Sequence, residues 1–133
     1  MNKLYGETVT LYHPDPAAQT VTRTVLRGVF WQQGRRELPD AGGPRQGAAM
    51  LLVVPETTAR YGVDYELEPG DRLCLGEGPV LTWADWPGFV PALTKNAAVV
   101  QYVLPMRLRG KRHHIEAGAW WSGSGTGVHS LTR

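Results

Sequence analysis

Two adjacent histidines and a nearby acid are the side chains best suited to bind a metal ion. His113, His114 and Glu116 offer imidazole and carboxylate groups, which suit zinc or non-haem iron. Neighbouring side chains on a strand point to opposite faces, so only His114 and Glu116 share a face. The other histidines fall in a predicted turn, His13, and in the C-terminal segment, His129. Because no third ligand is identified, the sequence favours polar surface at a hairpin and predicts no metal.

The serines and the glycine-rich segments lack the settings that catalysis needs. Nucleophilic hydrolysis uses a serine on a strained turn, as in G-x-S-x-G, with a histidine and an acid beside it. Ser122, Ser124 and Ser130 instead lie in a Gly-rich stretch that offers no rigid support. Residues 42–47 lack the Gly-Lys-Ser/Thr ending of a phosphate-binding loop. The carboxylates within residues 64–68 have a spacing that is common on any exposed strand. The sequence therefore predicts a protein that is not an enzyme and has no cofactor.

The tryptophans point to protein contacts. Five tryptophans are many for a chain of 133 residues, and tryptophan is enriched at the buried centres of interfaces. Trp31 and Trp83 fit a small β core. Trp120 and Trp121 are adjacent, so on an extended chain they face opposite sides, and residues 122–133 offer them no cover. We expect Trp120 and Trp121 to contact another subunit.

Nucleic-acid binding is the alternative use of these aromatic residues. They could stack on bases beside Arg107, Arg109 and Arg112, as in proteins of the OB-fold type. A formal net charge of +2 is too small to indicate a dedicated DNA-binding protein, which usually has a strongly basic face. A small OB-like β-barrel that binds nucleic acid therefore stays as the second choice behind a protein-binding structural role.

Length and composition predict one mainly-β domain. A chain of 133 residues can bury one core. Its 16 Gly and 10 Pro leave little room for long helices. Cys74 is the only cysteine, which excludes an intramolecular disulfide. The longest apolar run, residues 48–55, is too short for a membrane span, and the N-terminus lacks a secretory signal. We expect an intracellular protein.

Alternating apolar residues predict a small antiparallel β-barrel or β-sandwich. Residues 7–12 and 20–32 form a predicted hairpin, with a bulge at Gly28 where the apolar phase shifts. The continuous apolar run at residues 48–54 predicts a central strand that is buried on both faces. Further short strands are predicted at residues 72–75, 80–83 and 112–117.

The clearest alternation lies over residues 100–108 and predicts a half-buried strand. One face carries polar side chains, and the other carries Val100, Tyr102, Leu104, Met106 and Leu108. The apolar face is expected to turn toward the core. Pro105 cannot donate a hydrogen bond to a neighbouring strand, so this strand should lie at an edge or carry a bulge.

The remaining segments are predicted to have little regular structure. Residues 34–47 hold four Gly, two Pro and several charges without periodicity, which predicts a long exposed loop. Residues 91–98 are predicted to form one or two helical turns, so the fold has at most one short helix. We expect a single domain over residues 1–121 and a flexible Gly/Ser-rich tail over residues 122–133.

Several segments, taken in order, resemble a family of small structural proteins of tailed bacteriophages. These proteins belong to the head-to-tail connector, as head-closure (stopper) or related neck proteins. The segments that carry the resemblance are Thr10-Leu11-Tyr12, Arg23-Thr24-Val25-Leu26-Arg27-Gly28-Val29-Phe30-Trp31, Gly70-Asp71-Arg72-Leu73 and His113-His114-Ile115-Glu116-Ala117-Gly118. The resemblance implies a compact β core that assembles as a ring between portal and tail in the virion, around the DNA channel, with no enzymatic role.

The resemblance transfers no catalytic residues, so the candidate residues are contacts only. A closed ring needs two different patches on each subunit. We assign one to the loop at residues 34–47, with Arg35, Arg36 and Arg45, and the other to Trp120 and Trp121. The three arginines are also candidate contacts to DNA phosphates in the channel. A tail terminator or another minor tail or capsid protein is compatible with the same residues.

Overall fold

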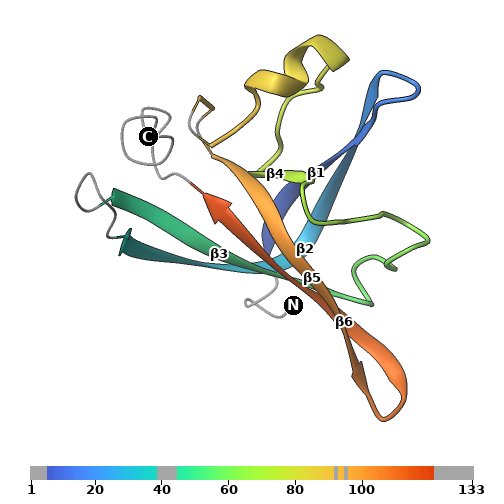
Figure 1. The fold of residues 1–133 in the computed structure, drawn as a ribbon. Coiled ribbons are helices and arrows are strands. Elements are labelled where there is room, and N and C mark those ends of the chain that lie inside the picture. The colour runs from blue at the N-terminus through green and yellow to red at the C-terminus, as the bar shows by residue number, and fades with distance from the viewer. Residues whose placement is uncertain (1–5, 39–44, 92, 95, 122–133) are drawn as a thin grey trace.

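The computed structural model has the chain folded as a small β-barrel. It describes residues 6–38, 45–91, 93, 94 and 96–121, and for residues 33–38, 45–48 and 121 it describes the backbone alone. The elements, which Figure 1 shows in order along the chain, are β1 (Glu7–Asp15), β2 (Thr20–Leu38), β3 (Arg45–Pro55), β4 (Arg72–Leu75), the 3-10 helix η2 (Trp83–Gly88), β5 (Ala97–Leu108) and β6 (Lys111–Trp121). The predicted fold class, a mainly-β chain with at most one short helix, is confirmed.

The six strands form one closed antiparallel barrel. Their order around the barrel is β1-β2-β3-β6-β5-β4, and β4 returns to pair with β1. Four of the five connections join neighbouring strands, and only the connection from β3 to β4 joins strands that are not paired. Two connections are long: residues 56–71 between β3 and β4, and residues 76–96 between β4 and β5. These two long connections lie outside the sheet and carry much of the surface described below.

Alternate residues of each strand fill the barrel. In β3, the side chains of Met50, Leu52 and Val54 are buried, while Leu51 and Val53 between them are only partly buried. The central position of this strand between β2 and β6 is as predicted. Its predicted burial on both faces is wrong, because Leu51 and Val53 on the outer face are only partly buried.

The bulge predicted at Gly28 is present. Glu7 pairs with Val29 and Thr8 pairs with Arg27, so Gly28 has no partner opposite it on β1. Its φ of 96° lies in the region that favours glycine. The bulge lets Leu26 and Val29, which are three residues apart, both face the core.

The predicted loop at residues 34–47 is mostly strand. β2 continues to Leu38 and β3 begins at Arg45, with Gly34 opposite Ala49 and Arg36 opposite Gly47. Glycines and charges are tolerated here because ladder hydrogen bonds between backbones do not depend on side-chain type. Only residues 39–44 of the predicted loop fall outside the described part, as does the predicted tail at residues 122–133.

Two local predictions between β4 and β5 are also wrong. Residues 80–82 belong to no strand, and Trp83 begins η2. The helix starts there because Thr82 and Asp85 form a capping box. Residues 91–98 form turns and the start of β5 in place of helical turns, as far as they are described. Within the described chain, no helix has the length and hydropathy to cross a membrane.

A histidine–aspartate pair fastens β1 to the turn that precedes β4. His13 Nδ1 lies 3.0 Å from both carboxylate oxygens of Asp71, and Glu68 Oε2 lies 3.7 Å from His13 Nε2. Asp71 is 3% exposed and also accepts a hydrogen bond from the Glu68 backbone N–H. The hydrogen bond to Asp71 raises the pKa of His13, and burial raises the pKa of Asp71.

The His13–Asp71 pair predicts a pH-dependent contribution to stability. The folded protein holds the His13 proton more tightly than the unfolded chain, whose histidine pKa is near 6.5. The stabilisation is therefore complete below that value and is lost as the pH rises through the higher folded pKa. His13→Gln is expected to lower the free energy of unfolding more at about pH 6 than at about pH 9.

Urea denaturation at the two pH values measures this difference. In an Asp71→Asn background, which removes the nearest charged partner, the effect of His13→Gln should depend much less on pH, because only the longer contact to Glu68 remains. A loss that is equal at both pH values in the wild-type background would contradict a raised His13 pKa.

Candidate interaction surface

The far half of β5 is an open edge of the sheet. β4 has four residues and pairs with β5 only over Ala97–Val99. Val100 makes two further backbone hydrogen bonds, to Gly70 and Asp71. From Gln101 onward, β6 is the only strand that pairs with β5 in the described chain. Pro105 therefore lies in an edge segment, as predicted.

Beyond the barrel, β5 and β6 continue together as a projecting two-stranded ribbon. β6 pairs with β3 only from His114 onward, so the hairpin end from Arg107 to Arg112 has no other strand beside it in the described part. Figure 1 shows this hairpin at the lower right, extending well away from the other strands. We call residues 107–112 the ribbon tip.

A bulge at Gln101 turns the predicted core face of β5 outward. Val100 pairs with Ala119 and Tyr102 pairs with Gly118, which leaves Gln101 without a partner. Ala98 and Val100 face the core before the bulge, and Val103 packs against the core after it. One extra residue reverses the alternation, because side chains on a strand repeat every two residues.

The prediction that this apolar face is half-buried is therefore wrong beyond Val100. Leu104, Met106 and Leu108 are 48%, 37% and 57% exposed. We call these three residues the outer apolar row. Tyr102 stands at its inner end, where its ring lies over Gly118 so closely that a Cβ there would overlap it. The Tyr102 hydroxyl donates to Glu116 Oε2 at 3.1 Å.

The ribbon tip is strongly basic. Residues 105–115 contain no acid and four cations, Arg107, Arg109, Lys111 and Arg112. Arg109 and Gly110, with φ of 54° and 80°, make the tight turn. Arg112 donates to the Tyr61 carbonyl at 2.7 Å, and Arg107 donates to the Gly110 carbonyl at 3.1 Å. Within the described residues, no carboxylate pairs with any of the four.

The two histidines of β6 lie close together, contrary to the prediction that they face apart. Met106 pairs with His114 and Arg107 pairs with Arg112, so His113 is bulged. The bulge brings the Nδ1 atoms of His113 and His114 to 2.9 Å. Both rings line an open cleft of about 760 Å³, together with Arg27, Pro55 and their neighbours. In the described part of the chain, no group of three His, Cys, Asp or Glu is placed to hold a metal ion.

A second apolar surface lies at the opposite end of the molecule, around η2. Val80 and Leu93 are 75% and 62% exposed. Beside them is an open hollow of about 480 Å³, which we call the η2 hollow. It is lined by Pro79, Val80, Leu81, Ala84, Asp85, Gly88, Phe89 and Thr94. Leu81 and Phe89 are buried side chains, so the hollow has a firm apolar floor.

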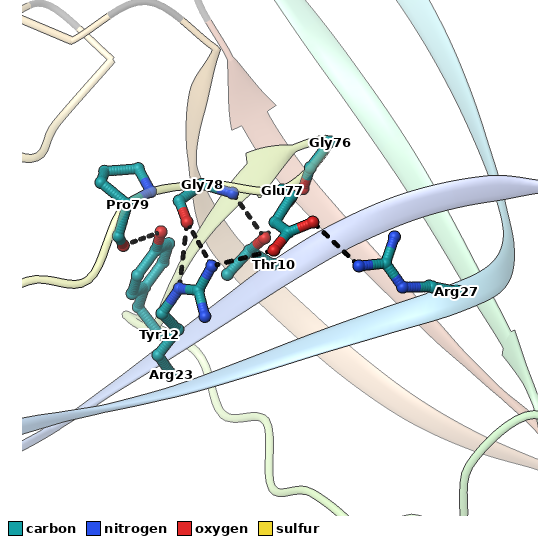
Figure 2. A network of polar contacts seen from close by, with 8 residues as sticks. All are labelled: Thr10, Tyr12, Arg23, Arg27, Gly76, Glu77, Gly78 and Pro79. Atoms are coloured by element: carbon teal, nitrogen blue, oxygen red, sulfur yellow. Dashed lines mark hydrogen bonds and ion pairs between the residues drawn. The ribbon is translucent and has the colours of Figure 1, made fainter.

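A network of hydrogen bonds holds the edge of this hollow to β1 and β2 (Figure 2). The buried Thr10 hydroxyl accepts from the Gly78 N–H and donates to the Gly76 carbonyl, both at 2.8 Å. The Tyr12 hydroxyl donates to the Pro79 carbonyl at 2.6 Å, and burial raises the pKa of Tyr12 to about 12. Arg23 donates twice to the Gly78 carbonyl, at 2.6 and 3.0 Å. Residues 76–79 are thereby fixed before Val80 begins.

Aromatic contacts hold η2 itself. The Arg72 guanidinium lies 3.8 Å from the centre of the Trp86 ring and donates to the Trp86 carbonyl. The rings of Tyr12 and Phe89 meet edge to face at 4.7 Å. Hydrogen bonds from Thr82 lower the pKa of Asp85, so Asp85 presents a full negative charge at the rim of the hollow at neutral pH.

The predicted contact residues fall mainly outside these two surfaces. Trp120 is half-buried in β6, opposite Ala49 on β3 and Val99 on β5. Trp121 continues β6, and its side chain is outside the described part. Arg35 and Arg36 lie on β2 and Arg45 on β3, at the end of the β2–β3 hairpin, with side chains that are likewise not described.

The sequence reasoning missed the outer apolar row and the η2 hollow. A signal was present in both cases. The apolar alternation of β5 continues through Leu108 to the turn, further than its partner β4 can cover. The Thr82-x-x-Asp85 spacing is a capping-box pattern that indicates a helix start in place of a strand.

A comparison of the chain with protein-family models, curated proteins and solved structures finds no significant match. The surfaces themselves therefore carry the functional argument.

Gly78 is the position at which the network of Figure 2 is most sensitive to substitution. A Cβ at Gly78 would overlap the Tyr12 hydroxyl and come within 2.9 Å of the Cys74 Cβ. Gly78→Ala is expected to destabilise the protein by about 1–3 kcal/mol in denaturant unfolding, because the buried site cannot expand freely. Gly88→Ala is the matched control, since nothing lies within 4 Å of its Cβ position. Equal stability of the two variants would contradict a fixed 76–79 segment.

Proposed function

We propose that this chain is a structural protein that works by binding other protein subunits. The observation that carries the proposal is the outer apolar row. Three large apolar side chains stand exposed on one face of a projecting edge strand. Soluble monomers rarely expose large contiguous apolar patches, and those that occur often mark a site of protein contact. An open strand edge is in addition a template for pairing with another chain.

Within this class, we propose a head-to-tail connector subunit of a tailed phage. The chain would form a ring between portal and tail, as a head-closure or stopper protein, in the neck of the virion after synthesis in the host cytoplasm. The proposal rests on the resemblance of the segments around Gly28 and His113, and the small closed barrel with a projecting hairpin is compatible with it. A tail terminator or another minor tail or capsid protein would use the same surfaces. Its partners would be further copies of itself and portal, adaptor or tail proteins.

The basic ribbon tip favours nucleic-acid binding as the second candidate. Arg107, Arg109 and Lys111 have no acidic partner in the described structure. Unpaired cations on a projecting ribbon suit contacts with phosphates, which carry no sequence preference. If the chain forms a ring around the DNA channel, Arg35, Arg36 and Arg45 are further candidates for contacts with DNA phosphates. The candidacy of these three arginines depends on the connector role.

Native mass spectrometry of the protein, alone and mixed with candidate portal and tail proteins, tests the function. We expect a discrete ring or a stoichiometric complex. Leu104→Ser should weaken that complex by about tenfold or more, because it removes exposed apolar area that the partner buries. Val63→Ser, which changes a 68% exposed side chain on the β3–β4 connection, is the control. A protein that stays monomeric with every partner, and instead binds oligonucleotides in a salt-sensitive way, would overturn the connector proposal.

A further inference from the structure

We infer that copies of this chain join head to tail, with the ribbon tip of one copy seated in the η2 hollow of the next. The inference rests on the proposed role as an assembling subunit and names the two surfaces that assemble. Both surfaces expose large apolar side chains, but the ribbon tip is basic and the η2 hollow is not. Figure 1 shows η2 at the top of the molecule and the β5–β6 hairpin at the lower right, so one copy can use both at once.

The shapes of the two surfaces are complementary. The ribbon tip is a projection, whose most exposed apolar side chain is Leu108, 57% exposed, with Met106 behind it on the same face. The η2 hollow is a depression of about 480 Å³ with Leu81 and Phe89 in its lining. A hollow of this size is large enough for an aliphatic side chain with part of the backbone that carries it. Seating Leu108 there would remove exposed apolar area from both partners.

The charges are complementary as well. The tip carries four cations and no acid. Residues 77–94, which form the hollow and its edge, contain Glu77 and Asp85 and no lysine or arginine. Asp85 lies at the rim and is ionised at neutral pH, because hydrogen bonds from Thr82 lower its pKa. Arg109 in the turn and Lys111 directly after it are the cations placed to meet this carboxylate when Leu108 is seated.

The same charges disfavour a symmetric pair. In a two-fold contact between tips, four cations would face four cations. In a two-fold contact between hollows, Asp85 would face its own copy. Like charges across an interface cost affinity, so each tip is matched to a hollow and not to another tip. A contact between two different patches is heterologous, and it can continue from copy to copy until a ring closes.

Both surfaces are firm enough to bind without reorganisation. The segment before Val80 is fixed by the hydrogen bonds from Thr10, Tyr12 and Arg23, and η2 is held by Arg72 on Trp86. The tip is a tight turn with Arg107 bonded across it to the Gly110 carbonyl. Preformed surfaces lose little conformational freedom on association, which favours affinity.

Two variants separate the two surfaces. Met106→Ser with Leu108→Ser removes the exposed apolar side chains at the tip and directly before it, and Val80→Lys places a cation at the hollow. All three side chains are exposed, so both variants are expected to fold, which circular dichroism and a thermal melt verify. Val63→Lys makes the same chemical change at a 68% exposed site outside both surfaces and is the matched control.

Sedimentation velocity and native mass spectrometry of the purified chain give the result. Wild type and Val63→Lys should self-associate, and each surface variant alone should do so about tenfold or more weakly. An equal mixture of the two variants should form a complex of two chains and no larger species, because the mixture retains one intact tip and one intact hollow.

The outcomes distinguish this inference from the proposed function. If the wild type assembles while Val80→Lys and the tip variant assemble equally well, the inference is overturned and the structural role stands. If the wild type assembles only with other proteins and not with itself, the inference is likewise overturned and the structural role stands. If the mixture of the two variants forms assemblies as large as those of the wild type, the contact is not head to tail. If the wild type is monomeric both alone and with every partner, the structural role and the head-to-tail contact are both overturned.

Discussion

Closure of the barrel by a very short strand is the constraint on which the surface depends. β4 has four residues, so it can join β1 to β5 over only a short length. Its two neighbours are longer, at 9 residues for β1 and 12 for β5. Closure satisfies the backbone hydrogen bonds of the barrel itself, but it leaves the excess length of both strands without a second neighbour in the described chain. One result is the open edge of β5, and another is the projecting β5–β6 hairpin.

Single-residue bulges then decide which side chains are displayed. The apolar alternation of β2 shifts by one residue at Gly28, and the bulge there keeps the apolar side chains on both sides of it in the core. The bulge at Gln101 does the opposite for β5, because it sends the apolar residues beyond it to the outside. A third bulge, at His113, brings two imidazole rings together. Each bulge moves one residue and thereby changes the environment of every residue that follows on that strand.

The long connection between β4 and β5 supplies the second surface without taking part in the sheet. Its first residues are bonded to Thr10, Tyr12 and Arg23, so the buried hydroxyl of Thr10 has both a donor and an acceptor partner. A buried hydroxyl without hydrogen-bond partners would destabilise the fold. The Thr10 hydroxyl therefore favours the one path of residues 76–79 that supplies both partners. Val80 stays exposed because that path leads it away from the barrel and no other described element covers it.

The sequence by itself determined the fold class, the strands that fill the core and the bulge at Gly28. Alternation with a period of two residues and a glycine at a phase change are local signals, and they do not depend on what lies beside the strand. The side to which Leu104, Met106 and Leu108 point was decided only by the tertiary structure. So was the continuation of strands through residues 34–38 and 45–47, where the composition indicates a loop. The physical reason is that register and strand length are set by pairing with distant segments: a short β4 and an unpaired Gln101 outweigh the local apolar pattern.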